Sequence, residues 1–390
     1  MTGAAQTTNG LREQAWEMAY DISAKFKDPE DRWRCVKRGL ELLRDDGIGN
    51  DPNEAALYRN LSWLFQHKIG GYFDDAQMTY KLRWAKEMEA VFHGRDDFQA
   101  LENPQTGEER ERARKLREVY KMDPALVRKV DETYGPFDWR LPDAHAVYWA
   151  ELARLEAKPK DQEALRRSIC QSMQQACLQS GTLNNSVTNI TTNNFILLPN
   201  LELVPKVHAA YEEMIGQADE PRMKANLRSG HKNFLKTAVY LLFEDDQVTK
   251  AAYWFNVLKT TYPNPFVGKQ ATMSMEDYAI GRIIEDYQGM DMNKVAAAIL
   301  SMFHREFVSL VRDQDDKAVN YRNLAREIWN RYTERLSDNS QKAGPPLQPL
   351  ADLRQEALDD ELSPSNQRMS MSSKAILRTK LGLPPPKESS

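Results

Sequence analysis

The chain has 390 residues, of which 41% are hydrophobic and 28% are charged, and its formal net charge is −4. A net charge this small creates no long-range field, so we expect no binding to nucleic acid. No apolar run approaches the roughly 18 residues needed to span a bilayer, and the polar start lacks the basic and apolar regions of a signal peptide. We therefore predict no membrane insertion by this chain. We expect a cytoplasmic location by default, with membrane association as part of a larger assembly as the alternative.

Apolar residues recur at helical spacing along most of the chain, which predicts an all-α protein. Helix starts are marked by an acid before a proline at Asp28-Pro29, Asp51-Pro52 and Asp123-Pro124. The acid can accept the unpaired N–H groups of the first turn, where proline loses no hydrogen bond. Thr106 and Glu109 form a capping box ahead of a further helix. In chain order, the predicted helices cover 11–26, 30–44, 53–69, 73–93, 107–121, 124–133, 142–157, 161–179, 201–217, 220–243, 246–261, 275–287, 291–312 and 316–336.

Three segments interrupt the helical pattern and define the expected domains. Residues 1–10 are predicted to be disordered. Residues 182–200 are rich in Asn and Thr and have no helical period, so we expect a loop or small hairpin between an N-terminal helical half (11–181) and a C-terminal half (201–336). From 337 the apolar stripe fades and prolines accumulate, which predicts a flexible tail over 337–390, with room for short helical pieces at 350–361 and 373–381.

A large-then-small pattern recurs five times within the predicted helices. An aromatic residue is followed three and four places later by a pair that includes a small residue, beginning at Trp16, Tyr58, Trp149, Phe234 and Tyr321. The small residue lets a neighbouring helix approach, and the aromatic ring fills the gap beside it. Helix pairs of this kind cannot bury their apolar faces alone and must stack. The pattern therefore predicts stacked helix pairs in an α-solenoid.

Residues 232–263 fit a tetratricopeptide-like unit best. Ala251, Phe255, Leu258 and Pro263 follow the small, aromatic, apolar and proline order of the second helix of that repeat. The glycine usual at the eighth position is absent, and the intervals between repeats vary. We therefore predict tetratricopeptide-like stacking and not a regular array.

Two stretches, 13–93 and 136–156, carry a family resemblance. The segments involved are QAWEMAYDIS at 14–23, DRW at 31–33, KRGLELL at 37–43, NEAALY at 53–58, FQHKIG at 65–70 and DWRLPDAHAVYW at 138–149. Together they resemble uncharacterised helical-repeat proteins of planctomycete and verrucomicrobial bacteria. Members of that group are larger and often carry a membrane-spanning segment before this region. The resemblance implies a helical-repeat fold and brings no known activity.

Candidate binding residues lie off the expected core faces of the helices. They are Trp63, Gln66, Arg83, Arg140 and Asn256. Trp63 lies off the apolar stripe of its helix, and an exposed Trp beside Arg is typical of a binding anchor. The alternative, which we favour, is that Trp63 packs against a third helix. The nearby run from His67 to Asp75 is either a ligand-binding turn or, as we expect, a helix end in which Gly70 or Gly71 is left-handed.

The densest polar and aromatic cluster lies between Phe137 and His145. Asp138, Arg140, Asp143 and His145 could converge on a ligand or a metal, but a third strong metal ligand at fixed spacing is missing. Such a loop more often forms a buried ion pair that fixes the start of a helix. We predict a structural role for the cluster, with a binding groove and then a metal or catalytic site as the alternatives.

These features predict a non-enzymatic helical-repeat scaffold that binds a protein or peptide partner on the surface of its first helices. No catalytic residue, metal or cofactor is predicted. One alternative is an enzyme or metal-binding protein with a site around 138–145. Another is a structural part of a larger envelope complex. A pocket that gathers His145 with carboxylates from another helix would favour the enzyme.

Overall fold

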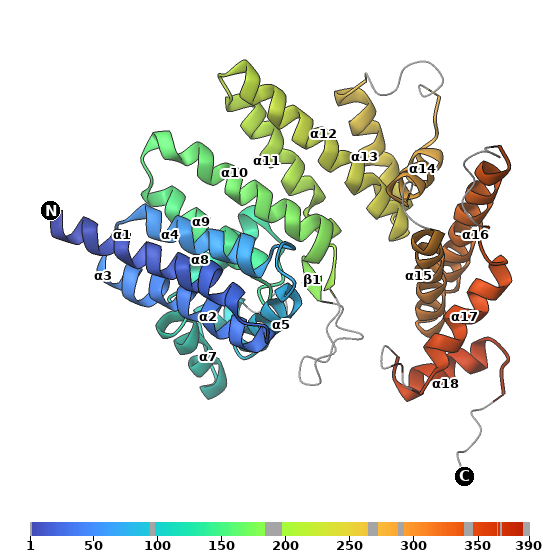
Figure 1. Ribbon diagram of the computed structural model, residues 1–390, viewed down its shortest axis with the longest axis horizontal. Helices are drawn as coiled ribbons and strands as arrows, with labels where there is room; N and C mark the ends of the chain where they lie inside the picture. The colour runs from blue at the N-terminus through green and yellow to red at the C-terminus, as the bar shows by residue number, and fades with distance from the viewer. Residues whose placement is uncertain are drawn as a thin grey trace, which may run out of the picture. The chain divides into compact units, whose positions relative to one another are not determined.

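The computed structural model describes residues 2–93, 98–183, 197–263, 272–287, 292–338, 346–364, 366 and 369–384. Helix makes up 79% of this part of the chain, and its only strands form one short pair, which confirms the all-α class. None of the helices described is long and apolar enough to cross a bilayer. The chain divides into two compact units, Met1–His231 and Lys232–Ser390, and the division falls inside one helix (Figure 1).

Unit 1 contains the first eleven α-helices, and several of them continue into a tighter or wider turn. The helices are α1 (Thr2–Trp16), α2 (Pro29–Glu41), α3 (Ile48–Asn50), α4 (Ala55–Trp63), α5 (Gln77–Glu89), α6 (Phe98–Glu102), α7 (Gly107–Glu118), α8 (Pro124–Tyr134), α9 (Pro142–Glu156), α10 (Pro159–Gln175) and α11 (Val204–Gln217). The π-helical turns are η1 (Glu17–Ile22), η3 (Leu42–Gly47), η4 (Leu64–Ile69) and η5 (Ala176–Ser180), and the 3₁₀ turns are η2 (Ser23–Lys25) and η7 (Leu201–Leu203).

The predicted helix starts are mostly confirmed by their caps. Asp28 accepts from the Glu30 N–H, Asp123 accepts from the Leu126 N–H, and Thr106 forms its capping box with Glu109. The prediction at Asp51-Pro52 is wrong, because α4 begins three residues after the proline and is capped by Glu54. The first helix also begins earlier than expected. Residues 2–10 are helical and not disordered.

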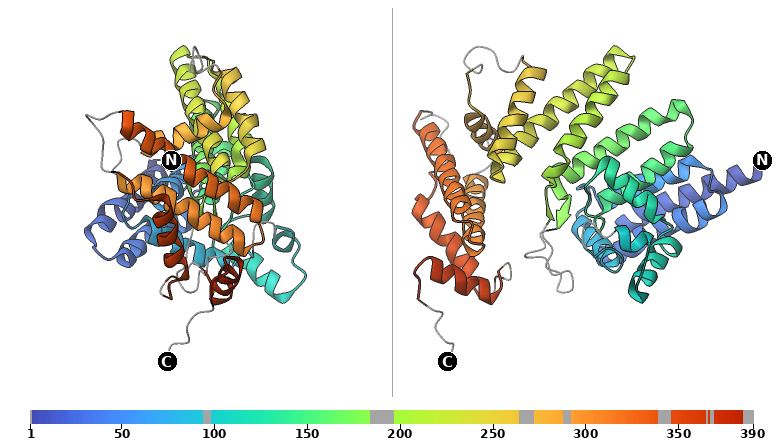
Figure 2. Two further views of the ribbon diagram at one scale, coloured as in Figure 1. Left: turned by 90° about the vertical axis from the view of Figure 1, so that its right-hand side faces the viewer. Right: turned by 180° about the vertical axis from the view of Figure 1, so that it is seen from behind.

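Packing in unit 1 brings together helices that are distant in sequence. Trp149 of α9 stacks on Tyr58 of α4. The Ser62 hydroxyl of α4 donates to the Ala146 carbonyl of α9 at 2.8 Å. α9 in turn packs against α10, while α5 to α8 lie between α4 and α9 in the sequence (Figure 1, Figure 2). A regular repeat array pairs helices that are neighbours in sequence. Tetratricopeptide-like stacking therefore stays a prediction.

The small residues of the repeated pattern do lie at buried positions. Ala19, Ser62, Ala153, Ala238 and Ala325 are all at most 1% exposed. The hydrogen bond from Ser62 to a neighbouring helix backbone illustrates the close approach that a small side chain permits. The aromatic partner is not always buried, because Trp16 is 48% exposed. That exception becomes part of the candidate site.

The ends of the Asn/Thr-rich segment meet as two short antiparallel strands. β1 (Thr182–Leu183) pairs with β2 (Leu197–Leu198), and residues 184–196 lie outside the described part of the chain. We had expected the boundary between the units at this segment, but it falls later in the chain, between His231 and Lys232. α11 belongs to unit 1 because it is tied back to it: Tyr211 donates to Gln174 of α10, and Lys206 donates to the Glu132 carbonyl of α8.

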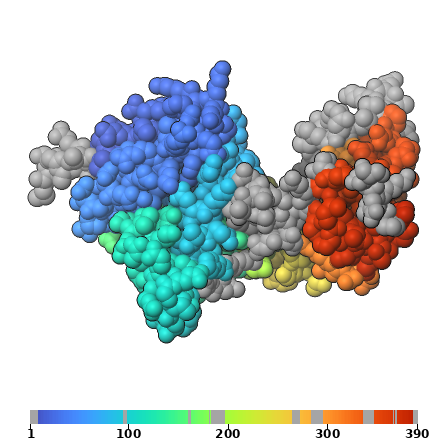
Figure 3. All heavy atoms as spheres, turned by 90° about the horizontal axis from the view of Figure 1, so that it is seen from below, coloured from blue at the N-terminus to red at the C-terminus, as the bar shows by residue number. Residues whose placement is uncertain are grey.

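Unit 2 is built around one central helix. Its elements are the second half of α12 (Pro221–Glu244), α13 (Val248–Thr261), α14 (Met275–Tyr287), α15 (Met292–Val311), α16 (Asp315–Asp338), α17 (Leu350–Leu362) and α18 (Met371–Lys380). α15 packs against α16, α17 and α18. In the space-filling view of Figure 3, the red residues of the last two helices lie against the orange residues of the preceding ones.

The short helical pieces expected at 350–361 and 373–381 are present as α17 and α18, but the prediction that they belong to a flexible tail is wrong. Leu353 and Leu377 are at most 1% exposed and belong to the core of unit 2. The buried carboxylate of Glu306 on α15 accepts hydrogen bonds from Arg354 of α17 and from Arg322 of α16. The prolines of this region separate short helices, and contacts to a distant part of the chain hold those helices in place.

Candidate functional site

The candidate site lies on unit 1, where two π-helical turns meet. α1 widens into η1 and α4 widens into η4, and the two turns contact each other. π-helical turns are rare and are frequently found at functional sites. η1 carries Tyr20, and η4 carries His67 and Lys68. The loop that follows η4 adds Phe73 and Asp74 to the same place.

Five aromatic rings form a continuous cluster here, which we call the aromatic surface: Trp16, Tyr20, Trp63, His67 and Phe73. The His67 ring is stacked between Trp63, at 4.8 Å, and Phe73, at 5.2 Å. Tyr20 stacks on Trp16 at 4.2 Å and lies 5.8 Å from His67. Trp63 is 38% exposed, and Phe73 is 86% exposed. The cluster thus presents large apolar side chains from three segments to solvent.

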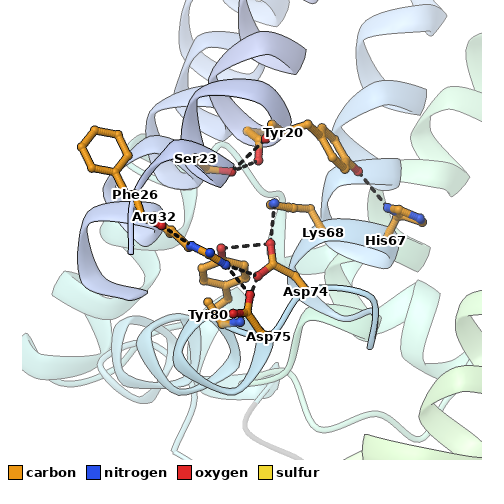
Figure 4. A network of polar contacts seen from close by, with 11 residues as sticks. Tyr20, Ser23, Phe26, Arg32, His67, Lys68, Asp74, Asp75 and Tyr80 are labelled. Atoms are coloured by element: carbon orange, nitrogen blue, oxygen red, sulfur yellow. Dashed lines mark hydrogen bonds and ion pairs between the residues drawn. The ribbon is translucent and has the colours of Figure 1, made fainter. Parts of the chain in front are cut away.

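A polar network lies beside the aromatic surface and fixes its segments (Figure 4). Its centre is the Asp74 carboxylate, which accepts from Lys68 at 2.6 Å, from the Tyr80 hydroxyl at 3.1 Å and from the Ala76 N–H at 2.9 Å. Arg32 of α2 also donates to Asp74, at 3.2 Å, and to Asp75. The Lys68 ammonium lies 5.1 Å from the centre of the Tyr20 ring. The network ties together α2, η4, the loop and α5.

The charges in this network are compensated, so the aromatic surface itself is close to neutral. Burial alone would raise the pKa of Asp74, but the hydrogen bonds from Lys68 and Ala76 hold that pKa below its usual value. Burial, and then the charge of Lys68, lower the pKa of His67, which favours the neutral ring. Burial raises the pKa of Tyr20, whose hydroxyl lies 3.1 Å from Nδ1 of His67.

The glycine turn after η4 positions Phe73 over His67. A Cβ atom at Gly71 would lie 2.2 Å from the His67 carbonyl oxygen, so the close backbone approach requires glycine. Our expectation of a left-handed glycine is wrong. Gly70 has φ −82°, and Gly71 does not appear among the glycines with positive φ. The turn depends on a close approach and not on backbone handedness.

The four other predicted surface residues have different surroundings. Gln66 is buried, which corrects the prediction, and its amide donates to the Ser168 carbonyl at 3.1 Å and to the Ser172 hydroxyl at 3.0 Å. Arg83 is partly exposed and forms an ion pair with Glu30 at 2.6 Å. Asn256 is exposed on α13 of unit 2. Arg140 is buried within the cluster described next.

Asp138 and Arg140 form a buried ion pair. Nε and Nη2 of Arg140 donate to the two carboxylate oxygens of Asp138 at 2.9 and 2.8 Å, and Nη1 donates to Glu89 of α5 at 3.1 Å. The pair sits at the start of α9 and joins it to α5. The prediction that Arg140 is a surface residue is therefore wrong, because its side chain is 7% exposed.

Asp143 and His145 are also buried, but they do not form a joint site with that ion pair. Nε2 of His145 lies 2.8 Å from the Trp139 carbonyl, and its ring packs against Phe65 and Trp84. Burial lowers the pKa of His145 to about 4. Burial raises the pKa of the Asp143 carboxyl, and the nearby charge of Lys81 partly opposes the rise. Hydrogen bonding from its own backbone and from the Gln175 side chain also opposes that rise.

The chemistry available to these four residues is limited by their burial. The described ranges contain no group of three or more His, Cys, Asp or Glu side chains placed to hold a metal. The neutral His145 ring, with a pKa near 4, is poorly matched to accept a proton at pH 7. The arrangement is that of a buried polar core around the start of α9.

Three members of the aromatic surface were not predicted as site residues from the sequence. Trp16 and Tyr20 belong to the repeated pattern that predicts helix packing, and Phe73 lies on no periodic stripe. The sequence did contain one usable signal, the pair Tyr72-Phe73 immediately after two glycines. Binding residues are disproportionately found on loops that a rigid scaffold positions.

Comparison with known proteins adds no assignment to this geometry. No family model, no curated protein and no solved structure matches the chain.

Proposed function

We propose that the chain is a non-enzymatic, tetratricopeptide-like helical-repeat scaffold whose aromatic surface binds a protein or peptide partner. The observation that carries the proposal is the exposure of Phe73 and Trp63 in one stacked cluster with His67. Exposed Trp side chains are enriched among the residues that contribute most to binding energy. The partner would contribute an apolar or aromatic side chain.

The rigidity of the cluster supports this function. Because Asp74 is held by Lys68, Tyr80 and Arg32, the loop that carries Phe73 is tied to three helical segments. Side chains held in their binding geometry lose less conformational entropy when a partner docks. An exposed ring such as that of Phe73 makes few contacts that would hold it in place. The hydrogen bonds of the neighbouring Asp74 therefore keep the loop in position when no partner is bound.

The two alternative functions would require different features of the structure. An enzyme or metal-binding protein with a site at 138–145 would need access to His145, which is 0% exposed. A structural part of a larger envelope complex would also use an exposed docking surface, so it differs from the scaffold in its partner and not in its site.

Site-specific photocrosslinking tests the proposal. A photoreactive phenylalanine analogue is placed at Phe73, at Trp63 and, as the control, at Tyr253, which is 62% exposed on unit 2. We expect the same partner to be crosslinked in native cells from positions 73 and 63 and not from 253. Crosslinks that are absent at both positions, or that occur equally at all three, would contradict the proposal.

A further inference from the structure

A second surface lies in unit 2 and is independent of the aromatic surface. A groove with a volume of about 480 Å³ runs between α14 and α16 and is also lined by the turn from α12 to α13. Its volume is within the range of specific binding sites. The floor is apolar, with the buried side chains Ile280, Tyr321 and Leu324, and Val248 at the rim is 39% exposed.

The rim of the groove is acidic. Asp246, Glu276 and Glu327 contribute three carboxylates, and Arg331 contributes the single guanidinium of the lining. The charge of Arg331 is already compensated, because it donates to Glu327 and to Asp277, each at 2.7 Å. Glu276 is exposed and has no ion pair among the described residues. The groove therefore combines an apolar floor with a rim on which two carboxylates, those of Asp246 and Glu276, have no ion pair among the described residues.

We propose that this groove binds a basic amphipathic helix of a partner protein. Its apolar side chains would enter between Ile280 and Leu324, and its Lys or Arg residues would face Glu276 and Asp246. A groove between two helices suits the apolar stripe of a third helix, which presents anchors at three- and four-residue spacing. The complementary charge selects a basic helix over an acidic one, which the rim would repel.

Fluorescence anisotropy with the full chain and three labelled peptides tests this proposal. The probe peptide carries Leu at helical spacing on a Lys background. One matched peptide replaces each Lys by Glu, and the other replaces each Leu by Ser. We expect the Lys/Leu peptide to bind at least about tenfold more tightly than either matched peptide, which corresponds to about 1.4 kcal/mol.

Variants of the chain locate the binding. Glu276→Lys reverses a rim charge and should weaken binding of the Lys/Leu peptide about tenfold. Glu356→Lys makes the same charge change at an exposed position of α17 and should leave binding unchanged. Val248→Ser removes an apolar rim contact and should also weaken binding.

Several results would overturn the proposal. Equal binding of the Lys/Ser and Lys/Leu peptides would reduce the effect to diffuse charge attraction, and equal loss in Glu276→Lys and Glu356→Lys would place the site elsewhere. Self-association of the chain that Glu276→Lys abolishes, seen in sedimentation velocity, would identify a second copy as the occupant.

Discussion

Protonation of His145 should destabilise unit 1 at mildly acidic pH. The ring is fully buried between Phe65, Trp84 and Trp139, and its Nδ1 has no hydrogen-bond partner among the described residues. A second proton would place a positive charge and an unpaired N–H group in this apolar site. Burial accordingly lowers the pKa of His145 from 6.5 to about 4.

The sign and size of the effect follow from the lowered pKa. Between these two values the unfolded state binds the proton more readily than the folded state, so stability falls as pH decreases through this window. A pKa unit corresponds to 1.36 kcal/mol. His145 alone should therefore cost about 2 kcal/mol between pH 7 and pH 5, and about 3 kcal/mol by pH 4.

Other buried groups titrate in the same range, so a variant must isolate His145. Burial lowers the pKa of His231 to about 4, helped by the charges of His208 and Arg228, and this adds to the loss at low pH. Burial raises the pKa of Asp143, which has the opposite sign, because the folded state then binds the proton more readily. Both groups are unchanged in His145→Gln, in which the amide can still donate to the Trp139 carbonyl.

The assay is urea unfolding followed by tryptophan fluorescence at pH 7, 6 and 5. All of the eight tryptophans except Trp254 and Trp329 lie in unit 1, so the signal reports mainly on that unit. We expect the wild type to lose about 2 kcal/mol more than His145→Gln between pH 7 and pH 5. His93→Gln, at an exposed position, is the control and should follow the wild type. Identical pH dependence in wild type and His145→Gln would refute the reasoning.

Three further predictions concern packing and ion pairs. Arg140→Ala leaves the buried Asp138 carboxylate without its partner and should lower the free energy of unfolding in urea by about 3–5 kcal/mol. Arg83→Ala breaks a partly exposed pair and should lower it by less than about 1 kcal/mol. Equal losses in the two variants would contradict this prediction. Ala153→Leu and Ala325→Leu should each cost about 1–3 kcal/mol through overpacking at fully buried positions, and unchanged unfolding midpoints would show that they are not at helix contacts. Leu377→Ala should cost unit 2 about 2–5 kcal/mol, and limited proteolysis should spare 350–380 in the wild type; an early cut there would mean that α17 and α18 are not docked.

Long helices with an apolar stripe were predictable from sequence. The short helices of the tail were anticipated as pieces, but their docking on unit 2 was not. The stripe that begins at Tyr321 and includes Leu324 and Ile328 predicted α16 closely, because a helix of 24 residues contains several helical periods. α18 has only 10 residues, which is too short for periodicity to be convincing among nearby prolines. What orders it is burial of Leu377 against α15, a contact that the local sequence does not contain.

The candidate site was predicted in part for a similar reason. Trp63 is the last residue of α4 and is 38% exposed, which agrees with its position off the apolar stripe; that it packs against a third helix, the interpretation we favoured, stays a prediction. Gln66 lies three residues later, in the π-helical turn η4, where the wider turn changes the direction of successive side chains. It therefore points toward Ser168 and Ser172, more than 100 residues away in sequence. Phe73 lies in a loop, where there is no helical periodicity from which the exposure of a side chain could be predicted.

The central claim is that the aromatic surface binds the partner, and the affinity of Phe73→Ala for the crosslinked partner tests it most directly. Phe73 is 86% exposed, so its removal should change the free energy of unfolding by no more than about 0.5 kcal/mol. Truncation of a binding anchor typically costs about 2 kcal/mol or more, which is roughly a 30-fold increase in Kd. Calorimetric titration should show that increase for Phe73→Ala, with an unchanged melt, and no change for the control Tyr253→Ala. A Kd for Phe73→Ala equal to that of the wild type would contradict the account.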